Sequence, residues 1–213
     1  MTSYTNTTLF PFAKSGAVPS YFEFHATDAG KRVGGDNMVY TLWIGTNDMG
    51  VLLTGNNPEV TVVDVAECMV NWVKVLYEFS GATNFVFQNM VPLQHTVLYT
   101  SNIQMTEQVA AGNELTKLML QNLVPTLDGA HVAYFDSHSL FQDIFDHPEN
   151  YLNGTAPFNV AGCITCSGAQ GTDQDSYLWF DQLHPSEQAD RIVAREIAKV
   201  FEGEENQWTT WLS

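Results

Sequence analysis

The sequence predicts an α/β fold, with helices on both faces of a doubly wound parallel sheet. Four short apolar runs, rich in β-branched and aromatic residues, alternate with longer segments of helical periodicity. Such connections are right-handed crossovers, which bring successive strands together in parallel. Residues 136–177 interrupt the alternation with many Asn, Gly, Pro, Ser and Asp residues, so we expect a loop there. Because ligands bind at the carboxyl edge of such sheets, we expect this loop to cover that edge.

Each predicted strand has the nearly continuous apolar pattern of a strand that is buried on both faces. The four candidates are residues 8–13, 38–44, 84–88 and 131–135. Pro11 lacks the backbone N–H that a central strand donates to its neighbour. We therefore expect the first candidate to be an edge strand or a strand end.

Three segments place apolar residues at the spacing of one helix face. They are residues 60–79, 105–123 and approximately 186–201. Gly81 follows the first and Gly203 follows the third, as is typical after a helix C-terminus. Ser186 is a favourable N-cap for the third helix. The spacing also puts Cys68 on the apolar face of the first helix, so we expect that side chain in the core.

The composition excludes several classes of partner. The 213 residues carry 8 Lys and Arg against 24 Asp and Glu, which gives a formal net charge of −16 at pH 7. Such a charge argues against binding to nucleic acid or to an anionic membrane. A chain of this size suits one domain, residues 1–213, and buries about 70% of the surface that its unfolded form exposes. Its core therefore needs no metal or disulfide for stability.

Signals for secretion are mixed. The N-terminus lacks the basic segment and apolar run of a signal peptide, and no apolar run reaches the ~18 residues of a membrane span. The sequons at Asn6 and Asn153 weakly favour a secreted glycoprotein. Cys163 and Cys166 would need two further ligands for a zinc site, which favours a local disulfide over a metal. We assign no function to this cysteine pair from the sequence.

The first candidate for chemistry is Gly45-Thr46-Asn47-Asp48, directly after the predicted strand 38–44. A side-chain amide at this place lies at the carboxyl edge of the sheet. Asn47 could then donate a hydrogen bond to a developing oxyanion, a contribution of ~3 kcal/mol in other hydrolases. The alternative is that these residues form an ordinary turn.

The second candidate is Asp181-Gln182-Leu183-His184-Pro185, ahead of the third predicted helix. A carboxylate three residues before a histidine can orient the imidazole, as in a Ser-His-Asp triad. The alternative is a surface histidine in a loop. The remaining histidines are scattered, so we expect no cluster among His25, His95, His131, His138 and His147.

Together the two candidate segments resemble sequence blocks of the SGNH/GDSL hydrolases. Residues 40–48 (YTLWIGTND) are similar to block III of that superfamily, and residues 177–188 (YLWFDQLHPSEQ) to block V. The aromatic surroundings and the closing residues 208–211 (WTTW) most resemble the fungal acetylesterases of the carbohydrate-esterase type. The resemblance extends from about Leu9 to the C-terminus.

The resemblance implies a role for each matching residue. Asp181 would orient His184, His184 would act as the general base, and Asn47 would donate to the oxyanion. Residues 12–18 resemble block II, whose glycine offers a second oxyanion donor from its backbone N–H, and this nominates Gly16. For Gly16 an ordinary turn is an equally good interpretation. The superfamily fold is flavodoxin-like, with strand order 2-1-3-4-5.

The nucleophile of the family is missing from this sequence. Block I, Gly-Asp-Ser, does not occur, and neither does a Gly-x-Ser-x-Gly elbow. Ser3 is the nearest candidate for the nucleophile, although no strand precedes it to hold it in place. Block I follows the first, central strand of the family sheet. We therefore expect this chain to be N-terminally incomplete and to lack that strand.

The resemblance implies an esterase that removes acetyl groups from oligosaccharides by Ser-His-Asp acyl transfer. It implies no cofactor and no metal, a small-molecule or oligosaccharide ester as the substrate, and a secreted monomer. Neither nucleic acid nor a membrane is an expected partner. The competing hypothesis is a catalytically inactive fragment or pseudoenzyme that would at most bind carbohydrate. A serine within hydrogen-bond reach of His184 would distinguish the two.

Overall fold

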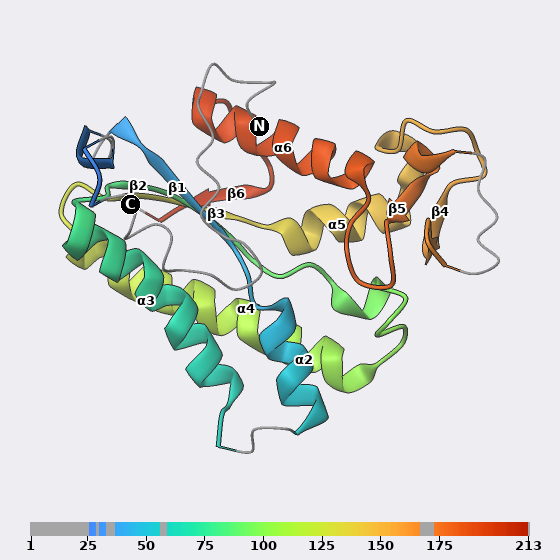
Figure 1. Ribbon diagram of the computed structural model, residues 1–213, viewed down its shortest axis with the longest axis horizontal. Coiled ribbons are helices and arrows are strands. Elements are labelled where there is room, and N and C mark those ends of the chain that lie inside the picture. The colour runs from blue at the N-terminus through green and yellow to red at the C-terminus, as the bar shows by residue number, and fades with distance from the viewer. Residues whose placement is uncertain (1–25, 29, 33–36, 56–58, 167–172, 213) are drawn as a thin grey trace.

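The computed structural model describes residues 26–28, 30–32, 37–55, 59–166 and 173–212 (Figure 1). The predicted strand 8–13, Gly16 and Ser3 lie outside these residues. Within them, a four-stranded sheet has the strand order β1-β2-β3-β6, and β4 and β5 form a separate pair. The sheet and its helices confirm the predicted α/β class.

Three parallel strands form the main part of the sheet. They are β1 (Val39–Trp43), β2 (Asn84–Gln88) and β3 (His131–Phe135). Two have the predicted bounds, and β1 is one residue shorter at each end than its prediction. The last residues pair in register, Trp43 with Gln88 and Gln88 with Phe135, so the three carboxyl ends lie side by side. Among the described residues β1 pairs with β2 alone, and the missing first strand of the family sheet stays a prediction.

Three short strands have no counterpart among the predictions. β6 (Thr209–Trp211) runs antiparallel to β3, while β4 (Asn159–Cys163) and β5 (Tyr177–Trp179) pair in parallel outside the main sheet. Runs of three to five residues are too short for a hydrophobic period to identify them. Their pairing partners, which are distant in the sequence, determine that they are strands.

Helices cover both faces of the sheet, with α3 and α4 packed together on one side and α6 on the other (Figure 1). The α-helices are α2 (Thr46–Thr54), α3 (Val62–Ser80), α4 (Ile103–Leu123), α5 (Ser137–Asp146) and α6 (Glu187–Glu202). The described residues also form short 3-10 helices at Gly30–Arg32, Leu93–His95, Val124–Thr126, Pro148–Asn150 and Gln174–Ser176. The three predicted helices correspond to α3, α4 and α6, within two residues at each end. Ser186 caps α6 as predicted, because its hydroxyl accepts from the N–H of Ala189 at 3.1 Å.

The prediction of a loop over residues 136–177 is wrong in part. This stretch contains α5 and β4, and its last residue begins β5. Leu140, Phe141 and Ile144 bury one face of α5, and Asp136 caps the helix by accepting from the N–H of Ser139 at 3.0 Å. Polar residues on the outer face of this short helix hide its periodicity in the overall composition.

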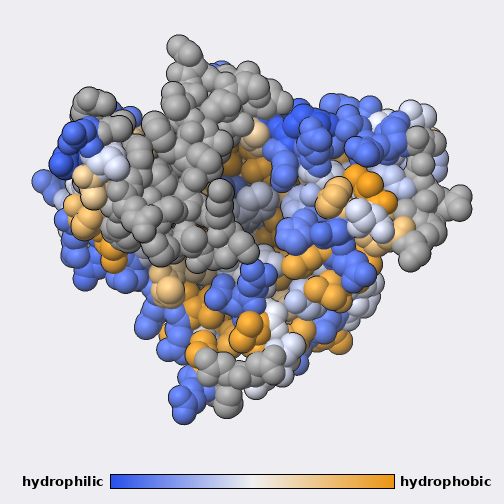
Figure 2. Space-filling view, viewed as in Figure 1, coloured by the Kyte–Doolittle hydropathy of each residue, from blue (hydrophilic) through white to orange (hydrophobic). Residues whose placement is uncertain are grey.

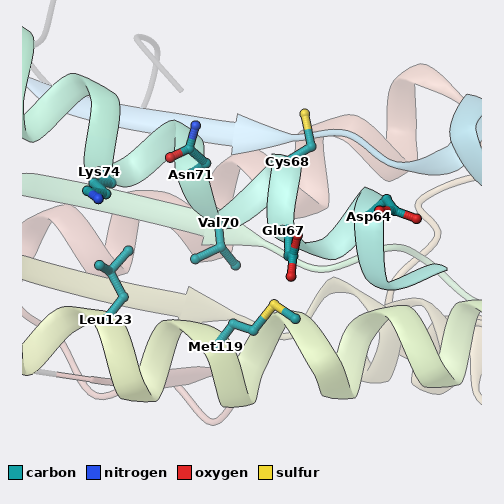
Figure 3. Close-up of a pocket in the computed structure, with 8 residues that line it drawn as sticks. All are labelled: Asp64, Glu67, Cys68, Val70, Asn71, Lys74, Met119 and Leu123. Carbon is teal, nitrogen blue, oxygen red and sulfur yellow. The ribbon is translucent and has the colours of Figure 1, made fainter. Parts of the chain in front are cut away.

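Cys68 is not in the core, contrary to the prediction. It is an exposed free cysteine on α3, whereas Val65, Ala66 and Met69 fill the buried face of the helix. Figure 3 shows Cys68 among the residues that line a groove of about 540 Å³ between α3 and α4. Successive residues of a helix differ by a rotation of about 100°, so Cys68 points away from the core although its neighbour Met69 is buried.

The core lies between the sheet and its helices. Fully buried aromatic side chains include Phe85 and Phe87 of β2, Phe135 of β3 and Trp179 of β5. The surface over α6 is mainly hydrophilic in Figure 2. In the ranges that the structure describes, the helices are too short or too polar to span a bilayer.

Candidate active site

The carboxyl edge of the sheet brings polar residues from three connections together. β1 continues into Gly45 and α2, β2 into Asn89, and β3 into Asp136. Because these parallel strands end level, the residues that follow them share one edge. The Asn89 side chain donates to the Asp136 carboxylate at 2.8 Å, so two of these connections are in direct contact.

Asn47 lies in the first turn of α2, with an exposed side chain. The segment is the start of a helix, because α2 begins at Thr46 directly after the Gly45 N-cap. Gly45 has a left-handed φ of +112°, and a Cβ there would lie 2.7 Å from Met90 Sδ. Both the backbone angle and the space require glycine. The turn at Gly45 therefore determines the position of Asn47 relative to β1.

We expect Gly45→Ala to lower the free energy of unfolding by about 2–4 kcal/mol, through backbone strain and the close approach to Met90. Urea unfolding measures the loss. Gly55→Ala is the matched control, since Gly55 also has a positive φ, of +66°, but a Cβ there would meet no atom within 4 Å. We expect this control to cost about 1 kcal/mol. Equal losses in the two variants would contradict the role of the Met90 contact.

Asp181 and His184 are in direct contact within one loop between β5 and α6, which we call the dyad loop (residues 181–184). His184 Nδ1 lies 2.9 and 3.0 Å from the two carboxylate oxygens of Asp181. The backbone N–H groups of Leu183 and His184 donate to Asp181 Oδ1 at 2.9 and 2.7 Å. The His184 side chain is 70% exposed, so the far side of the ring, which carries Nε2, is accessible.

Asp181 is ionised at neutral pH. Partial burial raises the pKa of its carboxyl group, but donors from the backbone of His184 and Leu183 and from the His184 ring outweigh burial. The pKa is therefore held below its usual value. A carboxylate in this state fixes the Nδ1–H tautomer and stabilises an imidazolium, as in a serine hydrolase.

Residues 98 and 99, in the connection after β2, link the dyad loop to α2. Leu98 N–H donates to the carbonyl of Gln182 at 2.9 Å. Tyr99 places its hydroxyl against Gly50 of α2, 2.7 Å from where a Cβ would stand. The dyad loop and the helix that carries Asn47 thus contact the same short segment. Gly16 and Ser3 lie outside the described residues.

Sequence reasoning missed a polar cluster around Asn89. Its side chain donates to Asp136 Oδ1 and accepts from the N–H of His138, both at 2.8 Å. Its backbone carbonyl accepts from Trp43 Nε1 at 3.2 Å. Asn89 therefore ties together the ends of β1, β2 and β3. The signal that could have found this cluster is a polar residue directly after two of the apolar runs.

The ionisation of Asp136 is linked to stability. Burial raises the pKa of its carboxyl group, but hydrogen bonds from Ser139 and Asn89 outweigh burial and hold the pKa below its usual value. A depressed pKa contributes stability that is fully present above the unfolded pKa, about 3.9, and is lost as pH falls through the folded value.

We expect Asp136→Asn to lower the free energy of unfolding by about 1–2 kcal/mol at neutral pH, because it weakens the α5 cap and the Asn89 contact. The difference from the unsubstituted chain should begin to shrink below a pH of about 4, where the unfolded carboxyl group takes up a proton, and should disappear once the native carboxylate is also protonated. Urea unfolding at neutral and acidic pH measures this. A difference that does not change with pH would contradict the role of the charge.

His138 is half-buried, and its environment includes Asp136 and His95. Burial lowers the pKa of His138, the nearby Asp136 opposes that effect, and the charge of His95 lowers the pKa further. The His95 ring stacks on Phe145 with centroids 3.9 Å apart, and its Nε2 contacts Gln142 Oε1 at 2.8 Å. Over the described ranges, no three His, Cys, Asp or Glu residues are grouped so as to hold a metal ion.

A carboxylate that orients an exposed histidine has the geometry of the His–Asp part of a Ser-His-Asp triad. Comparison with known proteins specifies the class. The family model described as GDSL-like Lipase/Acylhydrolase matches residues 4–197. The chain belongs to this family, which confirms the resemblance to the SGNH/GDSL hydrolases.

Several relatives cover most of this chain. An acetylesterase from Hypocrea jecorina is 30% identical over 241 residues, covering 95% of this chain and 68% of its own length. An acetylesterase from Thermothelomyces thermophilus is 27% identical over 174 residues, covering 79% of this chain and 54% of its own length. A GDSL esterase/lipase from Arabidopsis thaliana is 24% identical, covering 68% of this chain and 44% of its own length. The chain thus spans between 44% and 68% of the length of these relatives.

Proposed function

We propose that residues 1–213 form a single domain that hydrolyses carboxylic esters, acetyl esters in particular. The observation that carries the proposal is the contact of His184 with Asp181, which fixes one side of the imidazole and leaves the other side accessible. The two relatives named acetylesterases support acetyl as the acyl group, since they cover 95% and 79% of this chain.

In the proposed reaction, a serine hydroxyl attacks the ester carbonyl carbon while His184 Nε2 takes the hydroxyl proton. Asp181 holds the ring and stabilises the imidazolium. Asn47 and the backbone N–H of Gly16 donate hydrogen bonds to the oxyanion of the tetrahedral intermediate. The imidazolium then protonates the leaving alcohol. Water, activated by the same base, hydrolyses the acyl-serine to the free acid, and the scheme uses no cofactor.

We assign the alcohol part of the ester to a sugar hydroxyl. Phe180, directly before the dyad loop, is 48% exposed and offers an aromatic face on which a sugar ring can lie. The acidic surface favours neutral over anionic substrates. The exposed sequon residue Asn153 supports an extracellular glycoprotein, and we propose that it acts as a monomer.

The alternative is a chain without catalytic activity that at most binds carbohydrate. The observation that favours it is the absence of a Gly-Asp-Ser block from the sequence. The nucleophile decides between the two functions; the sequence leaves it unassigned, with Ser3 as the nearest candidate.

Hydrolysis of p-nitrophenyl acetate by the purified chain, with folding checked by circular dichroism, is the experiment that tests the proposal. The proposed function predicts turnover above the buffer rate, and loss of that turnover in Ser3→Ala would assign the nucleophile to Ser3. Turnover that survives this substitution assigns the nucleophile to another serine. A folded chain without turnover contradicts the proposal and favours the alternative.

A further inference from the structure

A disulfide-bonded turn lies against the strand that leads into the dyad loop. Cys163, the buried last residue of β4, is joined to Cys166, which confirms the expected local disulfide. The turn is also closed by the N–H of Cys166, which donates to the carbonyl of Cys163 at 3.2 Å. The cross-link restricts the backbone of the two residues that it encloses. We call residues 163–166 the disulfide turn.

Both enclosed residues donate hydrogen bonds to the chain that enters the dyad loop. Ile164 N–H donates to the carbonyl of Trp179 at 3.1 Å, and Thr165 N–H to the carbonyl of Phe180 at 3.0 Å. Phe180 directly precedes the dyad loop, and its own N–H donates to the carbonyl of His184 at 2.9 Å. The disulfide turn is therefore hydrogen-bonded to Phe180, and Phe180 is in turn hydrogen-bonded to the backbone of His184.

The exit of the dyad loop is supported separately. Ser186 N–H donates to the carbonyl of Leu178 at 2.9 Å, and its hydroxyl donates to the carbonyl of Tyr177 at 2.7 Å. These contacts join the N-cap of α6 to β5 and do not involve the disulfide turn. The hydrogen bonds of the disulfide turn therefore support only the entry of the dyad loop. A change in the turn is expected to move the dyad loop without unfolding α6.

The disulfide turn also shapes the surroundings of the dyad loop. Ile164 lines a cavity of about 300 Å³ together with Phe180 and Pro185, the residues directly before and after the dyad loop. The turn therefore borders the same cavity as the two ends of the loop, while its backbone hydrogen bonds reach Trp179 and Phe180 at the entry.

We propose that the Cys163–Cys166 disulfide is a positioning element of the dyad. When it is intact, the disulfide turn holds Asp181 and His184 in place, and when it is reduced the dyad loop loosens. The inference rests on the proposed function, which gives the dyad its role. A dithiol breaks the S–S bond, each sulfur gains one electron and one proton, and the dithiol is oxidised to its own disulfide. Cys166 is only partly buried, so a small dithiol can reach the bridge.

The test compares the oxidised chain with the chain reduced by dithiothreitol and with the double variant Cys163→Ala/Cys166→Ala. All samples carry Cys68→Ser, because the exposed thiol of Cys68 could otherwise exchange with the bridge. The oxidised chain that carries only Cys68→Ser is the reference for the reduced chain and the double variant. A separate measurement on the unsubstituted oxidised chain should give the same result as this reference.

Two NMR readouts report on the dyad directly. The first is hydrogen exchange at the amides of Leu183 and His184, which donate to Asp181. The second is the pair of 15N chemical shifts of the His184 ring, which report whether Nδ1 carries the proton. Neither readout requires turnover, so a failure of the proposed function is distinguishable from a failure of this inference.

We expect reduction to speed amide exchange at Leu183 and His184 on the order of tenfold. The ring signals of His184 should shift toward a mixture of tautomers, while the amides of β2 and β3 keep their exchange rates. Unchanged exchange and ring signals in the reduced chain would overturn the proposal. A uniform rise throughout the sheet, or unfolding of both the reduced chain and the double variant, would also overturn it. In that case the disulfide stabilises the whole fold and not the dyad loop.

Discussion

Replacing His184 with alanine is expected to lower kcat for p-nitrophenyl acetate about a million-fold, because no other group in the proposed scheme can take the serine proton. Residual turnover would come from oxyanion stabilisation and substrate binding alone. The imidazole is 70% exposed, so the free energy of unfolding should change by less than about 1 kcal/mol. Steady-state kinetics and urea unfolding on the same sample separate the two effects.

His131→Ala is the matched control for this substitution. His131 is also exposed, but it begins β3 and so lies at the amino end of a strand, away from the residues that follow the carboxyl ends. We expect this variant to keep its activity. Full activity in His184→Ala would refute the assignment of the base. Equal loss in both variants would point to a general effect on folding.

Asp181→Asn should lower kcat less, by about ten-thousand-fold, and for a different reason. The asparagine side-chain oxygen can still accept from the backbone N–H groups of Leu183 and His184, so the dyad loop keeps its shape. Its amide cannot stabilise an imidazolium, and its N–H₂ group favours the ring tautomer that lacks a proton on Nδ1. The substitution thus removes the charge and reverses the tautomer with little change of shape.

Kinetics together with the 15N shifts of the His184 ring measure both consequences of Asp181→Asn. Because the pKa of Asp181 is depressed, its charge also contributes stability that is present above a pH of about 3.9 and disappears as the carboxylate is protonated. The Asn variant should lose this pH dependence. Asp128→Asn, at an exposed position before β3, is the control and should leave both kcat and the ring signals unchanged. An Asp181→Asn variant with native kcat would exclude Asp181 as the orienting residue.

Strands that are buried on both faces were predictable to the residue. β2 and β3 match their apolar runs at both ends, because a continuous run of β-branched and aromatic residues has few stable alternatives to a buried strand. The α3 and α6 helices were predictable from their caps as well as their period. Gly81 ends α3 and Gly203 ends α6, both in a left-handed conformation, as their positions after the predicted helices indicate.

Elements whose stability comes from distant partners were not predictable in this way. β6 is a strand because Ala133, Tyr134 and Phe135 pair with it, and β4 is a strand because it pairs with β5, more than ten residues further along the chain. Helix α5 is only ten residues long, and one buried face of three side chains gives a weak pattern. In these segments tertiary contacts outweigh local preference.

In the candidate site, too, a contact between residues close in the sequence was predictable, and a contact between distant residues was not. The contact of Asp181 with His184 follows from their spacing, since a carboxylate three residues before a histidine in a tight loop readily reaches its ring. The contact of Asn89 with Asp136 joins residues 47 positions apart and has no local signature. It exists because β2 and β3 are neighbours in register, which brings the residues after them to one edge.

Local patterns in the amino-acid sequence were enough to define the α/β class, the parallel strands, the principal helices and the His–Asp pair. Their physical basis is short-range, because caps, periodicity and i,i+3 spacing act within a few residues. The tertiary structure alone decided the register of the strands, the Asn89 cluster and the hydrogen bonds of the disulfide turn to Trp179 and Phe180. These features depend on which distant segments pack against each other, and that choice is made by the burial and hydrogen bonding of the whole chain.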